Sequence, residues 1–584
     1  MVSEGGGGRP GEGAADGAPA RAWGGDGASD GFALRREAVA REAGGQGGAL
    51  VLEGSTERAV LHAAYELLGD LGARFPVGRA PELSGLARAR LDHVEPRASQ
   101  PAFSRRAFAS DIMTWHYEMP DRLSQHLEHD AEFIAWMAAR GINAFSFSRH
   151  PQDTRLKIDE LVPRYRERGI VSEYGGHVLS SLLPRERFDT NPDYFPVGAE
   201  GTRSARGNLC VSNRAARELV AESALRYVRD NPECGLLHIW GADVRSGAWC
   251  QCAACRTLTP QPQYATAVNA IAERLLKECD GGPPVAYLAY HDTLEPDPQL
   301  RPLPNVWFEW APRERCYSHA IDDPSCKTNP RYFESLRKYI DLFDGRGHVF
   351  EYYADAILFG GLAFATPSVI ARDLRAYRAL GLKSISCLTF GAYSVLAYPV
   401  NLETYVRATR SPDFEPDQML ADTAAALHPQ CSSEFAQAYR AIAHVSALIL
   451  NRGGDVMRPS LRPESAHMRP GELAAAMRHI EHAVEAADHV IASVHDSLAT
   501  AECAVWKYSR DVVSGIADYV AAGQEHGAEC ARRGEAALKK IGEALRHIAA
   551  VNNSAKGTWG AYDLERFLEN RLQRMRSRLD SGSA

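Results

Sequence analysis

The chain has 584 residues, of which 45% are hydrophobic and 24% are charged, the balance of an ordinary globular protein. The formal net charge of −8 argues against nucleic acid as the main partner, because phosphate binding needs a basic face. No continuous apolar stretch reaches the roughly 18–20 residues of a membrane helix, so we expect no membrane partner either.

The first 31 residues are rich in glycine, alanine and acidic side chains, and they are predicted to form a disordered tail. They contain no basic segment followed by an apolar core, so they are not a secretory signal and a cytoplasmic protein is expected. In a reducing compartment the twelve cysteines are expected to be free thiols or metal ligands rather than a disulfide framework.

Residues 32–100 are predicted to form a small α/β domain. An apolar strand is expected at residues 49–53, followed by a helix over residues 59–68 with apolar side chains at helical spacing. Ser55 or Thr56 is suited to cap the start of this helix.

Residues 101–410 alternate between short β-type runs and longer helical stretches, eight times in all. This alternation predicts an α/β protein with a (β/α)8 TIM barrel. A doubly wound open sheet is the alternative, but no glycine-rich phosphate turn follows the first strand. The predicted strands are residues 106–111, 143–148, 170–174, 236–243, 285–291, 306–310, 348–353 and 384–390.

Residues 411–584 are predicted to form a helical C-terminal domain. The stretches 472–493 and 534–551 are rich in alanine, with apolar residues three and four positions apart. Amphipathic helices of this kind pack on a barrel and can also supply the contact of a homo-oligomer.

Functional groups of a barrel gather at the C-terminal ends of its strands and in the loops that follow. The predicted ends carry many aromatic side chains, which stack on the apolar faces of sugar rings, so a carbohydrate ligand is expected. For the histidines, a purely structural role is an equal alternative. The candidate substrate-binding residues are Asp111, Trp115, His116, His177, Tyr290, His291, Trp310, Tyr352 and Tyr393.

Several carboxylates also follow predicted strands, and glycosidic bond cleavage needs one protonated and one ionised carboxyl group. Asp243, after the fourth strand, is the candidate acid, because an apolar strand and a small turn precede it. Glu351 and Glu309, on the seventh and sixth strands, are the candidates for the ionised partner. The alternative is that these carboxylates pair with arginines or only hydrogen-bond a ligand.

Three cysteines lie within six residues just after the fourth strand: Cys250, Cys252 and Cys255. Together with Cys210 they could supply the four thiolates that a structural Zn²⁺ prefers. Ordinary thiols are the alternative, and an iron–sulfur cluster would use the same ligands. Nothing in the sequence predicts an organic cofactor.

The segment 236–255, LLHIWGADVRSGAWCQCAAC, resembles an uncharacterised bacterial family related to alpha-glucuronidases and beta-hexosaminidases. So do the segments 201–213, 285–291 (VAYLAYH) and 63–75 (AAYELLGDLGARF), and the resemblance covers about residues 48–430. It implies a small N-terminal domain, a catalytic barrel and a helical C-terminal domain. It also implies an acid after strand four, where Asp243 stands although the relatives carry glutamate, and water-activating carboxylates where Glu309 and Glu351 stand.

These features together predict a glycoside hydrolase-like enzyme that cleaves a small intracellular glycoside or an oligosaccharide. One alternative is a non-hydrolytic protein that binds or modifies a sugar in a biosynthetic pathway, because folds do not fix function. Another is a metalloenzyme with a catalytic zinc at the cysteines.

Overall fold

The computed structural model describes residues 30–40, 46–88, 90–110, 123–148, 158–389, 391–450, 470–523, 525, 527–552 and 561–580. Residues 1–29 of the predicted disordered tail therefore lie outside the described residues. Among the helices of the described part, none is long and apolar enough to cross a membrane.

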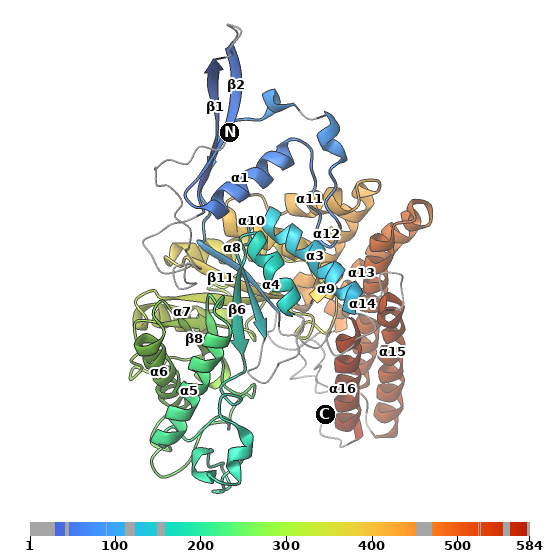
Figure 1. Ribbon diagram of the computed structural model, residues 1–584. Helices are drawn as coiled ribbons and strands as arrows, with labels where there is room; N and C mark the ends of the chain where they lie inside the picture. Colours follow the sequence, from blue (N-terminus) through green and yellow to red (C-terminus); the bar gives the residue numbers. More distant parts are fainter. Residues whose placement is uncertain are drawn as a thin grey trace.

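Eight parallel strands close into a barrel at the centre of the molecule, which confirms the predicted fold class (Figure 1). All eight predicted strands are present, and each pairs with the next along the chain until β11 pairs with β4 and closes the ring. The strands are β4 (Arg105–Ser110), β5 (Ala144–Ser148), β6 (Val171–Gly176), β7 (Leu237–Ile239), β8 (Val285–Ala289), β9 (Val306–Trp310), β10 (Gly347–Ala354) and β11 (Ser384–Thr389).

Helices follow the strands and form the outer layer of the barrel, as the alternating pattern predicts. Short 3-10 turns lie in the loops: η5 (Arg185–Phe188) and η6 (Pro192–Tyr194) after β6, and η7 (His291–Thr293) after β8. The helices of this layer are α3 (Leu123–Ala139), α4 (Ile158–Glu167), α5 (Arg214–Asp230), α6 (Pro260–Glu278), α7 (Asn329–Leu342), α8 (Pro367–Ala379), α9 (Gly391–Ala397) and α10 (Pro399–Arg410).

The fourth strand of the barrel is shorter than the sequence pattern predicts, since β7 ends at Ile239 rather than at residue 243. Polar side chains form hydrogen bonds with backbone groups that would pair with neighbouring strands if β7 were longer. The carbonyl of Gly241 contacts His177, and the amide of Ala242 donates to the side chain of Asn208. The chain therefore leaves the barrel four residues before Asp243.

The N-terminal unit is a three-stranded antiparallel sheet in the order β2-β1-β3, with α1 (Glu57–Asp70) packed on it. Its strands are β1 (Phe32–Ala40), β2 (Gln46–Gly54) and β3 (Arg97–Ser99), and the 3-10 turns η2 (Ser84–Arg88) and η3 (Leu91–His93) precede β3. The predicted cap is present, because the Thr56 hydroxyl accepts a hydrogen bond from the amide of Ala59 at 3.0 Å. Buried Asp30 joins the unit to the barrel through Arg106, at 2.7 Å.

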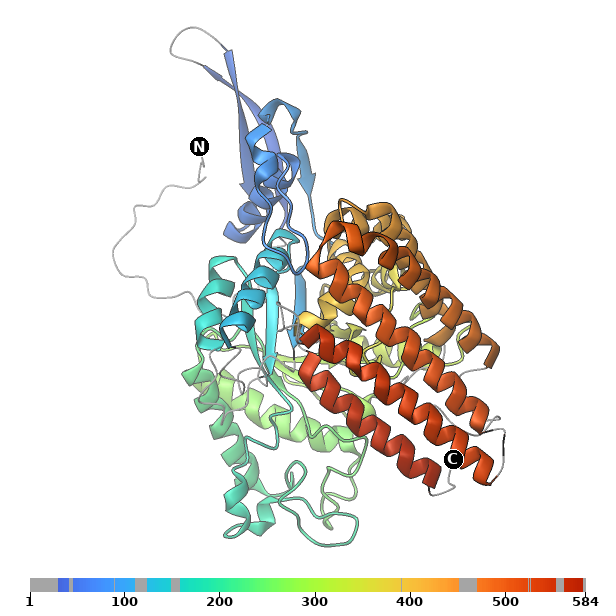
Figure 2. The same ribbon diagram turned by 90° about the vertical axis from the view of Figure 1, so that its right-hand side faces the viewer.

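The C-terminal part is helical, as predicted, and covers one side of the barrel. Figure 2 shows its four last helices lying side by side, each packed on the next in the chain. The helix α14 contacts the barrel, since Tyr508 donates to the carbonyl of Gly360 at 2.7 Å. The helices are α11 (Gln418–Leu427), α12 (Ser432–Ile449), α13 (Pro470–Val494), α14 (Ser497–Ala522), α15 (Ala528–Asn552) and α16 (Ala561–Asp580).

Candidate functional site

Asp243 lies between two histidines at the mouth of the barrel, where the C-terminal ends of the strands open. The Oδ1 atom of Asp243 is 3.9 Å from Nε2 of His177 and 4.0 Å from Nε2 of His291. The three residues come from the loops after β7, β6 and β8. The side chain of Asp243 is 62% exposed and those of the histidines are partly buried, so a ligand can reach this group from solvent. We call these three residues the mouth triad.

The backbone around the mouth triad fixes its geometry. Nδ1 of His177 lies 2.5 Å from the carbonyl of Gly241, so this nitrogen is the donor and Nε2 faces Asp243. His291 has a φ of +48°, a conformation that a residue with a side chain rarely adopts. A hydrogen bond from the amide of Tyr290 to the hydroxyl of Thr293 holds that turn.

Aromatic rings line the same mouth. The indole of Trp240 contacts the ring of His177 edge-on, with centroids 5.1 Å apart, and Tyr290 lies against His291 at 3.7 Å. The guanidinium of Arg313 lies 5.9 Å from the ring of Tyr352. Flat apolar rings beside polar groups are the surface that a sugar ring needs, because a sugar has apolar faces and a polar edge.

Three further carboxylates at the mouth come just after predicted strands, but none of them was among the predicted catalytic residues. Glu314 follows β9 and pairs with Arg245, which is two residues beyond Asp243. Asp355 follows β10 and pairs with Arg313 at 3.1 Å, while the amides of residues 357 and 358 also donate to it. Asp355 therefore has fixed partners, whereas the side chain of Glu314 is 30% exposed.

Asp292 is the third of these carboxylates, in the turn η7 next to His291. Burial raises the pKa of Asp292 to about 6, although a hydrogen bond from Trp249 acts in the opposite direction. A carboxyl group with this pKa is partly protonated near neutral pH, as an acid catalyst must be.

Glu309 does not lie at the mouth but inside the barrel, fully buried. Its carboxylate accepts hydrogen bonds from His238 at 2.9 Å and from the indole of Trp240 at 2.6 Å. Nε2 of His348 is 3.2 Å from its other oxygen. Burial by itself would raise the pKa of Glu309, but the two histidines hold it well below its usual range.

The polar interior continues beyond Glu309. His238 also donates to Glu173 at 3.3 Å, and Glu173 in turn binds Arg105 at 2.6 Å. Burial opposes a charge on His238, but the carboxylates of Glu309 and Glu173 outweigh it and raise its pKa to about 9. Burial and nearby Arg105 lower the pKa of His348 to about 4. We call Glu309, His238, His348, Glu173 and Arg105 the interior network.

Glu351 lies on the outer face of its strand. Side chains alternate along β10, and Phe350 points inward to Trp240, so Glu351 points outward. It contacts Arg315 at 3.3 Å and accepts a hydrogen bond from Tyr377 of α8. The structure does not bring Glu351 together with Asp243. Glu351 instead pairs with an arginine, which was the alternative to a catalytic role in the sequence analysis.

The remaining predicted binding residues divide into three groups. His177, Tyr290, His291 and Tyr352 lie at the mouth. Trp310 points outward, where its indole donates a hydrogen bond to Ser335 of α7. Tyr393 is buried, and its hydroxyl donates a hydrogen bond to the carbonyl of Gly361. Asp111, Trp115 and His116 lie outside the described residues.

The four predicted metal ligands do converge. Sγ of Cys210 is 3.8 Å from that of Cys252 and 3.9 Å from that of Cys255, and all four sulfurs, with that of Cys250, lie within 4.8 Å of one another. These residues, the four-cysteine cluster, could hold a metal ion. Two further groups could also do so: Cys316 with His319 and Cys326, and the buried set His238, Glu309 and His348.

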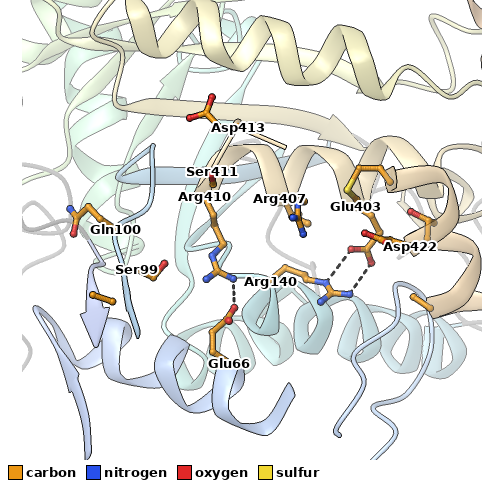
Figure 3. Close-up of a pocket in the computed structure, with 15 residues that line it drawn as sticks. Glu66, Ser99, Gln100, Arg140, Glu403, Arg407, Arg410, Ser411, Asp413 and Asp422 are labelled. Carbon is orange, nitrogen blue, oxygen red and sulfur yellow. Dashed lines mark hydrogen bonds and ion pairs between the residues drawn. The ribbon is translucent and has the colours of Figure 1, made fainter. Parts of the chain in front are cut away.

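A pocket of about 640 Å³ lies at the opposite end of the barrel, where the strands begin. Figure 3 shows that its charged side chains face one another: Arg410 pairs with Glu66, and Arg140 pairs with Glu403 at 3.1 Å. These pairs tie the N-terminal unit and α10 to the barrel. In barrels this end serves stability and the other end serves function, so the mouth remains the candidate site.

Solved structures similar to this chain include several glycoside hydrolases. A GH138 enzyme targeting the pectin rhamnogalacturonan II matches with a TM-score of 0.55 and 10% identity, over 95% of this chain and 92% of its own. A GH89 enzyme from Clostridium perfringens, in complex with its substrate GlcNAc-alpha-1,4-galactose, matches with a TM-score of 0.54 and 11% identity. That match covers 93% of this chain and 66% of the enzyme. At such low identity these likenesses show a shared fold.

No curated protein matches the chain in sequence. The family described as "Domain of unknown function (DUF4838)" matches residues 99–391, half of the chain, which spans the barrel from just before β4 to the end of β11. The protein therefore belongs to the DUF4838 family.

Proposed function

We propose that this protein is a glycosidase whose active site is the barrel mouth around the mouth triad. The observation that carries the proposal is the position of Asp243, a solvent-accessible carboxylate within 4.0 Å of two histidines and beside aromatic rings. The barrel is the fold of the glycoside hydrolases described above, and their substrates are carbohydrates. The substrate would be a small glycoside or an oligosaccharide, and the protein would act in the cytoplasm.

In this proposal Asp243 protonates the oxygen of the leaving group, as expected from the sequence. Its position suits that task, because the exposed carboxyl group can contact the glycosidic oxygen of a sugar bound at the mouth. Nε2 of His177 and of His291 would orient Asp243 or bind sugar hydroxyls. Asp292 is the other candidate for the acid, because of its raised pKa.

The ionised partner is Glu314 rather than Glu309 or Glu351. Both Glu314 and Asp243 act electrostatically on His291, and Arg245 binds Glu314 from the loop that carries Asp243. Glu309 and Glu351 are fully buried and engaged with other side chains. The reaction is carried by carboxyl groups and needs no organic cofactor.

The test compares single variants on aryl glycosides of both anomers, including N-acetylglucosaminides, glucuronides and rhamnosides. Asp243→Asn should lower turnover of a glycoside with a poor leaving group by about 10²–10⁴-fold. It should largely spare a dinitrophenyl glycoside, whose leaving group needs no proton. Glu314→Gln should lower both rates, and Glu218→Gln, an exposed residue of α5, should lower neither.

Two outcomes would contradict the proposal. One is a wild-type protein that binds these sugars without cleaving any of them, which would favour the non-hydrolytic alternative. The other is an Asp243→Asn protein that keeps full turnover of the poor-leaving-group substrate. If Asp292→Asn shows the selective loss instead, the acid is Asp292 and the site stands.

A further inference from the structure

The four-cysteine cluster joins two loops that are far apart in the sequence. Cys210 lies near the end of the long loop after β6, and the other three cysteines lie in the loop between β7 and α6. A tetrahedral zinc with Zn–S bonds of about 2.3 Å places its sulfurs about 3.8 Å apart. The distances of 3.8 and 3.9 Å from Cys210 to two of its neighbours match this geometry.

Hydrogen-bond donors surround the sulfurs. The amides of Val197 and Cys252 point at Sγ of Cys250, at 3.4 and 3.5 Å. The guanidinium of Arg203 lies beside Cys210 and donates to its sulfur. Donors of this kind are the outer-shell groups that stabilise metal-bound thiolates, because each thiolate carries a charge that the metal only partly neutralises.

The backbone between the sulfurs is also held in place. The buried amide of Gln263 accepts a hydrogen bond from the backbone N–H of Cys250 and donates to the carbonyls of Cys250 and Cys255. Three of the four cysteines are buried, and only Cys252 is partly exposed. The protein therefore holds the backbone of these ligands in place, and preorganisation of this kind lowers the cost of forming a metal site.

The two loops contain little regular structure of their own. Between β6 and α5 there are only two short 3-10 turns, and between β7 and α6 there is no helix or strand among the described residues. Figure 1 shows these loops at the end of the barrel to which β6 points. Buried apolar side chains such as Leu182 and Phe195 pack this region on the barrel, and a cross-link would fasten its two loops to each other.

We propose that the four-cysteine cluster binds one Zn²⁺ as a structural site that fastens the loop after β6 to the loop carrying Asp243. Four protein ligands fill the tetrahedron, so the ion has no open position for water and takes no part in the chemistry. The group of Cys316, His319 and Cys326 offers only three ligands and is not part of this proposal.

The experiment uses the full-length protein, purified without added metal, and measures metal content per chain. We expect one zinc per wild-type chain and at least a tenfold lower content in Cys255→Ser. Cys279→Ser changes a partly exposed cysteine at the end of α6, outside the cluster, and should keep the zinc. Replacement by Co²⁺ should give the absorption of a tetrahedral cobalt–thiolate centre, and zinc removal should expose the loop 177–213 to protease.

Several results would overturn the zinc assignment. They are a wild-type protein with no bound metal and four freely reactive thiols, iron in place of zinc, or disulfides among the four cysteines. If Cys255→Ser does not fold, the metal content of the wild type and the cobalt spectrum decide the question. None of these measurements depends on glycosidase activity, so the proposal is independent of the proposed function.

Discussion

The interior of the barrel and its mouth both hold carboxylates beside histidines, but the two regions use them differently. In the interior, Glu309 is fully buried and engaged by His238, His348 and Trp240. At the mouth, Asp243 is largely exposed and lies 3.9–4.0 Å from its two histidines, outside direct hydrogen-bond distance. One oxygen of the interior carboxylate already accepts two hydrogen bonds, whereas the carboxylate at the mouth has room for a ligand.

Burial distinguishes the structural carboxylate of Glu309 from the candidate catalytic carboxylate of Asp243. A charge removed from water is costly unless it is paired, and His238 pairs with both buried carboxylates, Glu309 and Glu173. An exposed carboxylate is solvated by water and can exchange that water for a substrate. Variants of the two regions should therefore differ in kind, with stability lost in the interior and turnover lost at the mouth.

The largest effect on stability is expected for Glu309→Ala. It would leave charged His238 buried without one of its two carboxylates, and breaking a buried ion pair costs about 3–5 kcal/mol. Urea unfolding monitored by circular dichroism measures this loss. Glu314→Gln, at a half-buried position of the mouth, should change the free energy of unfolding by less than about 1 kcal/mol. Equal losses for the two variants would remove the distinction between the regions.

The next effect concerns pH. The raised pKa of His238, about 9 against an ordinary 6.5, means that the folded protein holds a proton that the unfolded chain releases between these values. This contribution to stability is fully present below pH 6.5 and is lost as the pH rises through 9, to the extent of about 3 kcal/mol.

Urea unfolding between pH 6 and pH 9.5 checks this expectation. His238→Gln should lack the alkaline decline that the wild type shows. His348→Gln is the matched control, because the pKa of His348 is lowered to about 4 and its contribution changes only between pH 4 and 6.5. A wild-type protein whose stability stays constant from pH 6.5 to 9 would show that His238 is not charged in the folded state.

A smaller loss is expected for Glu351→Gln. Arg315 keeps its second partner Asp373, so the variant loses charge-assisted hydrogen bonds and leaves no unpaired arginine, at a cost of about 2 kcal/mol. Turnover per folded molecule should stay at the wild-type value. This variant tests the catalytic role that the sequence suggests for Glu351, and a loss of turnover of 10²-fold or more without unfolding would restore that role.

The smallest effect is expected at the rim of the mouth. Arg245→Ala breaks an exposed ion pair with Glu314 and should cost at most about 1 kcal/mol of stability. It removes the arginine that positions the carboxylate of Glu314, the proposed ionised partner, so kcat is expected to change more than KM. Steady-state kinetics on the substrate identified in the glycoside panel separates these two parameters. A change in unfolding free energy as large as that of Glu309→Ala would mean that the rim is part of the core.

Local sequence patterns predicted the barrel, the helical C-terminal part, a cap at Ser55 or Thr56, and a cluster of four cysteines as one of two interpretations. Strand and helix periodicity, capping residues and short ligand spacings are local signals, and local signals can be followed along a single chain. The strand at residues 306–310 was predicted to the residue.

Which carboxylates face the mouth depends on the tertiary structure. Glu351 and Trp310 lie on outward positions of their strands, and one residue of register moves a side chain to the opposite face. Glu309 points inward but lies too deep, where buried histidines engage it. Glu314 and Asp355 follow the strand ends and were not selected, because their position depends on how the loops fold over the barrel, which no local pattern encodes.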